Sequence, residues 1–166
     1  AMAGMKVAEA NTLDSVVLLN RGERFEMRPL PGEAQWSPVF GISVGDVDGD
    51  GREDVFLGQN FYGNDLEIGR YDAGRGLWLK GDGKGGLTPL SAAESGVRRY
   101  GEQRATALVD ADRDGRLDLV VTQNGGESVV YANRGGTPGV RVRVKGVAGN
   151  RWGIGTQVRW GKGPVK

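Results

Sequence analysis

The feature that most constrains the fold is an acidic segment that occurs twice. The chain reads GDVDGDGRED over residues 45–54 and VDADRDGRLD over residues 109–118. Counted from its first aspartate, each copy has aspartate at positions 1, 3, 5 and 9, glycine at position 6 and arginine at position 7. The copies are separated by 64 residues, and the apolar segments that follow them align at the same shift. The chain therefore contains an internal repeat.

A second short element occurs three times. It reads VVLLNRG at 16–22, LWLKGDG at 77–83 and VVYANRG at 129–135. Short apolar runs that end in Gly, Asn or Asp are typical of strands and turns, and no window has the 3.6-residue period of an amphipathic helix. Glycine provides 30 of the 166 residues, which favours many tight turns. These patterns predict an all-β fold, a partial β-propeller of two to three four-stranded blades.

The composition excludes several kinds of site. The chain has no cysteine and no histidine, which removes disulfides, thiolate and imidazole metal ligands, and the commonest general base. No stretch approaches the ~18 apolar residues of a membrane span. Residues 1–13 lack the charged and apolar regions of a signal peptide, and we interpret them as an N-terminal tail or a cloning remnant.

The acidic segments have the chemistry of a calcium loop. Alternate spacing lets a curled loop turn every second carboxylate inward, and a glycine after the third aspartate permits the sharp turn. A hard cation with about six to eight oxygen ligands would cancel the repulsion, and calcium suits a flexible loop better than magnesium. Zinc would need histidine or cysteine. We expect two Ca²⁺ sites per chain, with ligands from Asp46, Asp48, Asp50, Asp54 and the carbonyl of Arg52, and from Asp110, Asp112, Asp114, Asp118 and the carbonyl of Arg116.

These loops are not EF-hands, because the bidentate glutamate that an EF-hand needs at position 12 is replaced by Leu57 and Val121. Instead, FGISVGDVDGDGREDVFLG (40–58) resembles the FG-GAP repeat, also described as VCBS, of integrin α-like β-propellers. ATALVDADRDGRLDLVVTQ (105–123) is similar, although Arg104-Ala105 replaces the Phe-Gly pair. GNRWGIGTQVRW (149–160) resembles the start of an ASPIC/UnbV segment.

The resemblance implies a division of the chain and a cellular location. Residues 14–138 would form the propeller blades, with calcium loops at 46–54 and 110–118 that each join two adjacent strands. Residues 139–166 would form a basic strand and the ASPIC/UnbV-like segment. Related propellers are secreted, cell-surface or periplasmic, so the same location is expected here.

The function predicted first is that of a non-enzymatic, calcium-binding module for adhesion or for binding a protein or glycan. An open stack of blades leaves exposed faces and strand edges, which favour association. We therefore expect the module to be completed by self-association into a homo-oligomer.

Two alternatives belong to other classes. From Ser128 onward the chain has eight basic residues and no acidic one, so its C-terminal region is a candidate for binding nucleic acid or another polyanion. The residues that would do so are Arg141, Arg143, Arg151, Arg159, Trp152 and Trp160. The simpler interpretation of VRVRVK (140–145) is a strand with a solvated basic face. A metal-dependent hydrolase is the third alternative, but carboxylates saturated by calcium transfer protons poorly.

Overall fold

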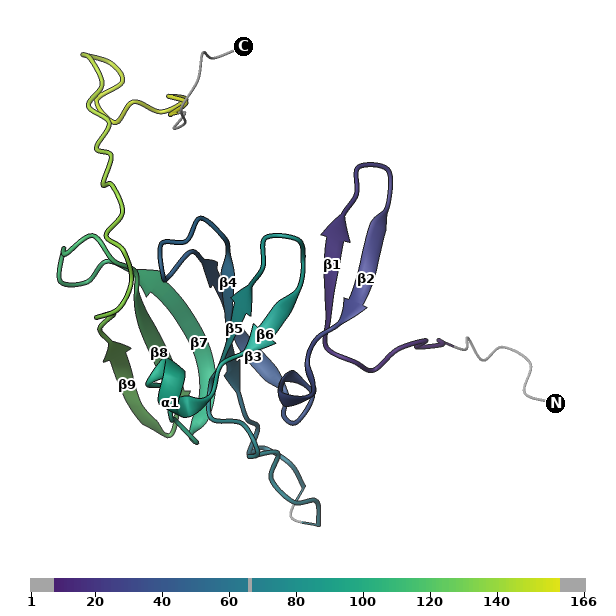
Figure 1. Ribbon diagram of the computed structural model, residues 1–166. Helices are drawn as coiled ribbons and strands as arrows, with labels where there is room; N and C mark the ends of the chain where they lie inside the picture. The colour runs from purple at the N-terminus through teal and green to yellow at the C-terminus, as the bar shows by residue number, and fades with distance from the viewer. Residues whose placement is uncertain (1–7, 66, 159–166) are drawn as a thin grey trace.

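The computed structural model describes residues 8–65 and 67–158, which form three antiparallel sheets (Figure 1). The strands are β1 (Val16–Asn20), β2 (Phe25–Pro29), β3 (Val39–Gly45), β4 (Asp54–Gln59), β5 (Leu77–Gly81), β6 (Leu87–Pro89), β7 (Glu102–Val109), β8 (Asp118–Asn124) and β9 (Gly126–Tyr131). The helices are the 3₁₀ helix η1 (Gly32–Ala34) and α1 (Ala92–Ser95). The all-β prediction is confirmed. No helix in the described ranges is long and apolar enough to cross a membrane.

Each sheet pairs strands that follow one another in the chain. The first sheet contains β1 and β2, the central sheet has the order β3-β4-β5-β6, and the third has the order β7-β8-β9. None of the three closes into a barrel or ring. Within residues 8–65 and 67–158, the four strands per sheet that the repeat predicts are therefore found only in the central sheet.

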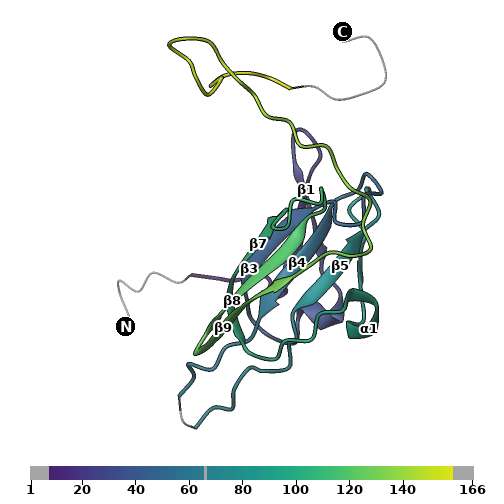
Figure 2. The same ribbon diagram turned by 90° about the vertical axis from the view of Figure 1, so that its left-hand side faces the viewer.

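The described part of the chain adds no fourth strand to the third sheet, because the segment after β9 takes another route. The Thr137 N–H donates to the Asp48 carbonyl (3.0 Å) and the Gly139 N–H to the Gly115 carbonyl (2.7 Å), which leads the chain past both acidic loops. Residues 140–158 then run away from the sheets without forming a strand (Figure 2). The basic strand predicted at the start of 139–166 is thus absent from the described residues, because no neighbouring strand pairs with it.

The internal repeat is reproduced in the backbone. The β3–β4 pair closes on Gly45 opposite Asp54, and the β7–β8 pair closes on Val109 opposite Asp118. Both hairpins also carry an irregularity at the same repeat position, between Val39 and Gly41 in one and between Gln103 and Ala105 in the other. The two acidic segments therefore form equivalent hairpin loops, and both loops lie at the same end of their sheets (Figure 1).

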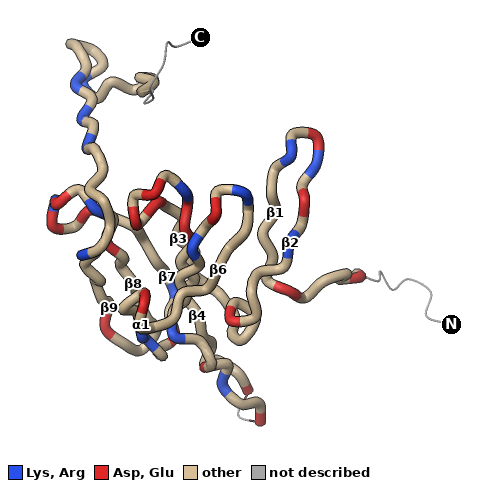
Figure 3. Tube along the Cα trace, viewed as in Figure 1, with Lys and Arg blue, Asp and Glu red and all other residues tan. Residues whose placement is uncertain are grey.

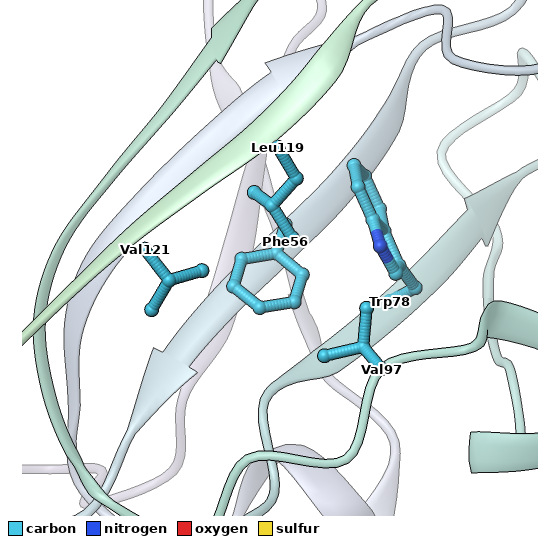
Figure 4. Packing of buried hydrophobic residues seen from close by; sticks show 5 residues of the cluster. All are labelled: Phe56, Trp78, Val97, Leu119 and Val121. Carbon is cyan, nitrogen blue, oxygen red and sulfur yellow. The ribbon is translucent and has the colours of Figure 1, made fainter. Parts of the chain in front are cut away.

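Two apolar cores cover the two faces of the central sheet. One lies against the third sheet and contains Phe56, Trp78, Val97, Leu119 and Val121 (Figure 4). The other contains Ala34, Leu57, Leu77 and Leu79, on the side of the β2–β3 connection. Strands buried on both faces read as continuous apolar runs, which explains the VFL and LWL segments of β4 and β5.

The central and third sheets approach closely at their first strands. A Cβ atom placed on Gly41 would lie 2.9 Å from Thr106 Cγ2, and one on Gly45 would lie 2.8 Å from Leu108 Cδ1. The hydroxyls of Ser43 and Thr106 are hydrogen-bonded at 2.8 Å. Small side chains on β3 thus make room for the larger ones on β7.

Candidate metal centres in the acidic loops

The first acidic loop is held in a tight curl by its first aspartate. One carboxylate oxygen of Asp46 accepts hydrogen bonds from the N–H groups of Gly49 (2.8 Å) and Asp50 (3.1 Å), and the other accepts from Gly51 (2.9 Å). Gly49 and Gly51 adopt left-handed conformations, with φ of 77° and 84°. Glycine has no Cβ to oppose these angles, so the sequence permits the curl that turns alternate aspartates inward.

Three carboxylates of this loop converge. Oxygen atoms of Asp46, Asp48 and Asp50 lie within 4.8 Å of one another. The Lys80 ammonium, which comes from β5, contacts Asp48 and lies 3.4 Å from Oδ2 of Asp50. The Lys80 ammonium donates a hydrogen bond to Asp48, which lowers the pKa of the Asp48 carboxyl. The same hydrogen bond raises the pKa of Lys80. The three carboxylates thus already attract one positive charge, the ammonium group of Lys80.

Asp54, the fourth predicted carboxylate ligand, lies beside this group and is buried. Its Oδ1 accepts from the Gly81 N–H (3.0 Å) and its Oδ2 from the Val47 N–H (3.3 Å). Burial raises the pKa of the Asp54 carboxyl despite these two donors. Each carboxylate oxygen has a second lone pair, so both atoms keep a free acceptor position. Asp54 fastens the loop to β5.

The second loop brings together a different set of carboxylates. Oxygen atoms of Asp110, Asp112 and Asp118 lie within 4.8 Å of one another. Asp110 Oδ2 accepts a hydrogen bond from Arg141 Nη2 at 3.0 Å. Asp110 Oδ1 is buried and accepts no hydrogen bond from any described residue. A buried carboxylate oxygen without a partner is costly, so this atom fits a site for a hard cation.

Asp114 is drawn out of that set by a neighbouring arginine. It accepts hydrogen bonds from the Arg116 N–H (2.9 Å) and from Arg116 Nη1 (2.5 Å), and Arg116 Nε donates to the Gly136 carbonyl at 2.6 Å. The backbone N–H of Arg116, followed by its side chain, lowers the pKa of the Asp114 carboxyl. Three of the four predicted carboxylates converge in each loop, but the fourth differs: it is Asp54 in one and Asp114 in the other.

Asp118 occupies the position that Asp54 has in the first loop. It is buried, and it accepts from the N–H groups of Ala111 (2.9 Å) and Asn133 (2.8 Å). The carbonyl oxygens of Arg52 and Arg116 stay predicted ligands. Both arginines follow a glycine with positive φ, 84° at Gly51 and 89° at Gly115, so the two loops share this turn.

Three residues at these sites were missed by reasoning from the sequence. Lys80 and Arg141 contact the acidic loops from positions far along the chain. Asn133 joins the two loops, because its Nδ2 donates to the carbonyls of Val47 (2.7 Å) and Leu117 (3.2 Å). The only signal for Asn133 is its place in the recurring NRG turn, and nothing in the sequence pairs the two cations with their loops.

A cleft of about 510 Å³ opens beside the first loop, between the central and third sheets. Its wall includes the apolar side chains Trp78, Leu119 and Tyr131, and its polar side includes Asp48 and Asn133. Apolar walls with a few polar groups are typical of ligand sites. The cleft is a second feature that the sequence does not predict.

Comparison of the chain with protein-family models, with curated proteins and with solved structures finds no match.

Proposed function

We propose that this chain is a calcium-stabilised, propeller-type module that binds a protein or glycan and performs no chemistry itself. The observation that carries the proposal is that each of the two equivalent hairpin loops brings together three aspartates, whose carboxylate oxygens lie within 4.8 Å of one another. The buried Oδ1 of Asp110, which accepts no hydrogen bond from the residues that the structure describes, supports it independently. The resemblance of residues 40–58 and 105–123 to FG-GAP repeats favours calcium and the propeller arrangement.

In this proposal the ions would be structural. Asp46, Asp48 and Asp50 would hold one, and Asp110, Asp112 and Asp118 the other, with Asp54, Asp114 and the two arginine carbonyls as additional ligands. A bound ion supplies positive charge that cancels the repulsion among the carboxylates and fixes the loop. The millimolar calcium of secreted, cell-surface or periplasmic surroundings would fill even weak sites.

Open sheet surfaces are where a partner would bind. Val109 and Val130 are exposed on the third sheet, and Ile42 and Val44 on the first strand of the central sheet. Exposed apolar rows of this kind favour association, including self-association. Light scattering at micromolar concentration tests the homo-oligomer: a mass above that of one chain supports it, and a clean monomer mass opposes it.

Thermal unfolding with calcium and with a chelator tests the calcium-dependent function. We expect calcium to raise Tm, and we expect Asp50→Ala and Asp112→Ala each to reduce that rise. Asp14→Asn is the matched control, because Asp14 is exposed and lies outside both loops. Identical curves with and without calcium would refute the proposal.

Polyanion binding is the second candidate. Residues 140–158 run away from the sheets, and Figure 3 marks basic positions along this segment in blue. Trp152 is 74% exposed. Arg159 and Trp160, which belong to the same prediction, lie outside the described residues. Filter binding to single-stranded DNA over a salt series tests this candidate. We expect the affinity to fall steeply as salt rises, and we expect Arg143→Ala and Trp152→Ala each to weaken binding. Affinity that is weak and unchanged in both variants would refute it.

A further inference from the structure

We propose that Asn124 is a modification site, at which the side-chain amide is converted to a carboxylate by reaction with the backbone nitrogen of Gly125. The product would place a second negative charge beside the buried carboxylate of Glu102 and weaken one end of the β7–β8 pair. This inference goes beyond the calcium-dependent function and does not depend on it. The Asn-Gly sequence, the turn that holds it and the contact of the amide with Glu102 support it together.

The reaction needs no co-reactant other than water. The backbone nitrogen of the next residue forms a bond to Cγ of the asparagine and loses its proton, while the bond from Cγ to Nδ2 breaks and ammonia leaves. The product of this step is a cyclic imide. Water then adds to an imide carbonyl and opens the ring. Opening at one carbonyl gives aspartate, and opening at the other gives isoaspartate, in which the chain continues through the side-chain carbon.

The residue after Asn124 favours the ring closure. Glycine has no Cβ to crowd the attacking nitrogen, and it adopts backbone angles that other residues avoid. Asn124-Gly125 is the only Asn-Gly pair in the sequence. Gly125 is the turn residue between β8 and β9, with φ of 66°, and a Cβ placed on it would meet no other described part of the chain within 4 Å. The attacking nitrogen therefore lies in an open turn.

This turn lies at the end of the third sheet opposite the acidic loops, because consecutive hairpins of an antiparallel sheet turn at alternate ends (Figure 1). Asn124 and Gly125 are both exposed, so water reaches the site. Asn124 pairs with Glu102 at the last position of the β7–β8 ladder. A change at Asn124 thus affects the end of the ladder and leaves the acidic loops unaltered.

The contact of the Asn124 amide determines what the modification does. Its Nδ2 donates to Oε2 of Glu102 at 2.7 Å, and Glu102 is 3% exposed. The other oxygen, Oε1, binds the Tyr62 N–H and Arg104, so Oε2 has no second donor among the described residues. An ionised carboxylate cannot donate a hydrogen bond. The modification would therefore leave Oε2 without a donor and bring a like charge to it.

Asn60, the corresponding residue 64 positions earlier, is a control within the same chain. It is fully buried, and its Nδ2 donates to the carbonyls of Gly74 (2.9 Å) and Tyr100 (3.0 Å). The next residue is Phe61, whose N–H donates to the Tyr71 carbonyl at 2.9 Å. The amide and the nitrogen that would attack it are both held, so we expect Asn60 to stay unmodified.

Peptide mass spectrometry of the whole chain, kept in warm, mildly alkaline buffer, measures the conversion. Trypsin releases residues 117–134 as one peptide, and fragment ions then distinguish Asn124 from Asn133. We expect Asn124 to convert at least about tenfold faster than Asn60, and we expect Gly125→Ala to slow the conversion about tenfold. The time course is run in chelator, so its result does not depend on calcium binding by the acidic loops.

Thermal unfolding measures the effect of the new charge. Asn124→Asp represents the aspartate product, and Asn124→Ala removes the donor without adding a charge. We expect Asn124→Asp to lower Tm by roughly 2–4 °C more than Asn124→Ala does. In the Glu102→Gln background the two variants should have nearly equal Tm, because the repulsion needs both carboxylates.

Three results would overturn the inference. One is conversion of Asn124 no faster than that of Asn60, a comparison that needs no variant of the protein. Another is conversion that is equally fast in Gly125→Ala. The third is equal Tm for Asn124→Asp and Asn124→Ala with Glu102 in place, because the new carboxylate would then have no effect on Glu102.

Discussion

Arg141 Nη2 lies 3.0 Å from Oδ2 of Asp110, so a guanidinium from the segment after β9 binds a carboxylate of the second acidic loop. An incoming cation must displace it. Arg141→Met should therefore raise calcium affinity at this loop by about two- to fivefold, the range expected for loss of a weak competing ion pair. Calorimetric titration measures it. Arg143→Met is the control, because it removes the same charge from a residue that contacts neither loop among the described residues. An equal gain in calcium affinity in this variant would show that the change in net charge, and not the loss of the ion pair, causes the effect.

Lys80 is the competing cation in the first loop, where its ammonium group contacts the carboxylates of Asp48 and Asp50. Without calcium, Lys80→Met should lower Tm by roughly 2–4 °C, because the carboxylates lose their only nearby ammonium group from the described strands. With calcium the difference should shrink, since the ion replaces that charge. Thermal scans in chelator and in calcium check both statements, with Lys84→Met as the control. A loss of Tm that is the same in both buffers would contradict the prediction.

Glu102 gives the fold a pH dependence outside the acidic loops. Its buried carboxylate accepts hydrogen bonds from the Tyr62 N–H (2.9 Å) and Asn124 Nδ2 (2.7 Å) and contacts Arg104. These contacts, the Tyr62 N–H first, lower the pKa of Glu102. A lowered folded pKa means that the stabilisation is present above the unfolded pKa of about 4.5 and is lost as pH falls through the folded value.

Glu102→Gln should accordingly lower the free energy of unfolding at pH 7. The difference from the unaltered chain should shrink steadily below about pH 4, where the carboxylate of the unaltered chain becomes protonated. Urea unfolding at a series of pH values measures it. A difference that is constant from pH 7 to pH 3 would show that charge has no part in the role of Glu102.

Gly49 tests the backbone of the first loop. Its φ of 77° is unfavourable for other residues, and a Cβ there would lie 2.5 Å from Cβ of Thr137. Gly49→Ala should cost about 1–3 kcal/mol of unfolding free energy. Gly32→Ala is the control, because Gly32 has nothing within 4 Å of such an atom and should change stability by about 0.5 kcal/mol or less. Comparable losses in both variants would contradict this account of the loop.

The sequence was sufficient to predict the repeating hairpins, because their signals are local. The 64-residue repeat, the turn glycines and the double-sided apolar runs together specify β3–β4 and β7–β8 and the loops between them. The fourth strand of the third sheet could not be predicted in this way. The alternation of valine and basic residues at 140–145 is suitable for a strand, but strand formation needs a neighbouring edge, and hydrogen bonds of Thr137 and Gly139 lead the chain elsewhere.

The acidic sites were predictable in kind but not in detail. The identical spacing of the two motifs predicts identical ligand sets, yet Arg116 draws Asp114 aside in only one of them. Lys80 lies 32 residues from Asp48, and Arg141 lies 31 residues from Asp110. Contacts between residues this far apart depend on the tertiary fold, which a linear motif does not contain.

The most direct test of calcium binding by the acidic loops is a calorimetric titration of the chelator-treated chain with calcium chloride. We predict two ions bound per chain, one lost in Asp48→Ala and the other lost in Asp112→Ala. No measurable binding at millimolar calcium, or binding that persists unchanged when both aspartates are replaced, would contradict the proposal.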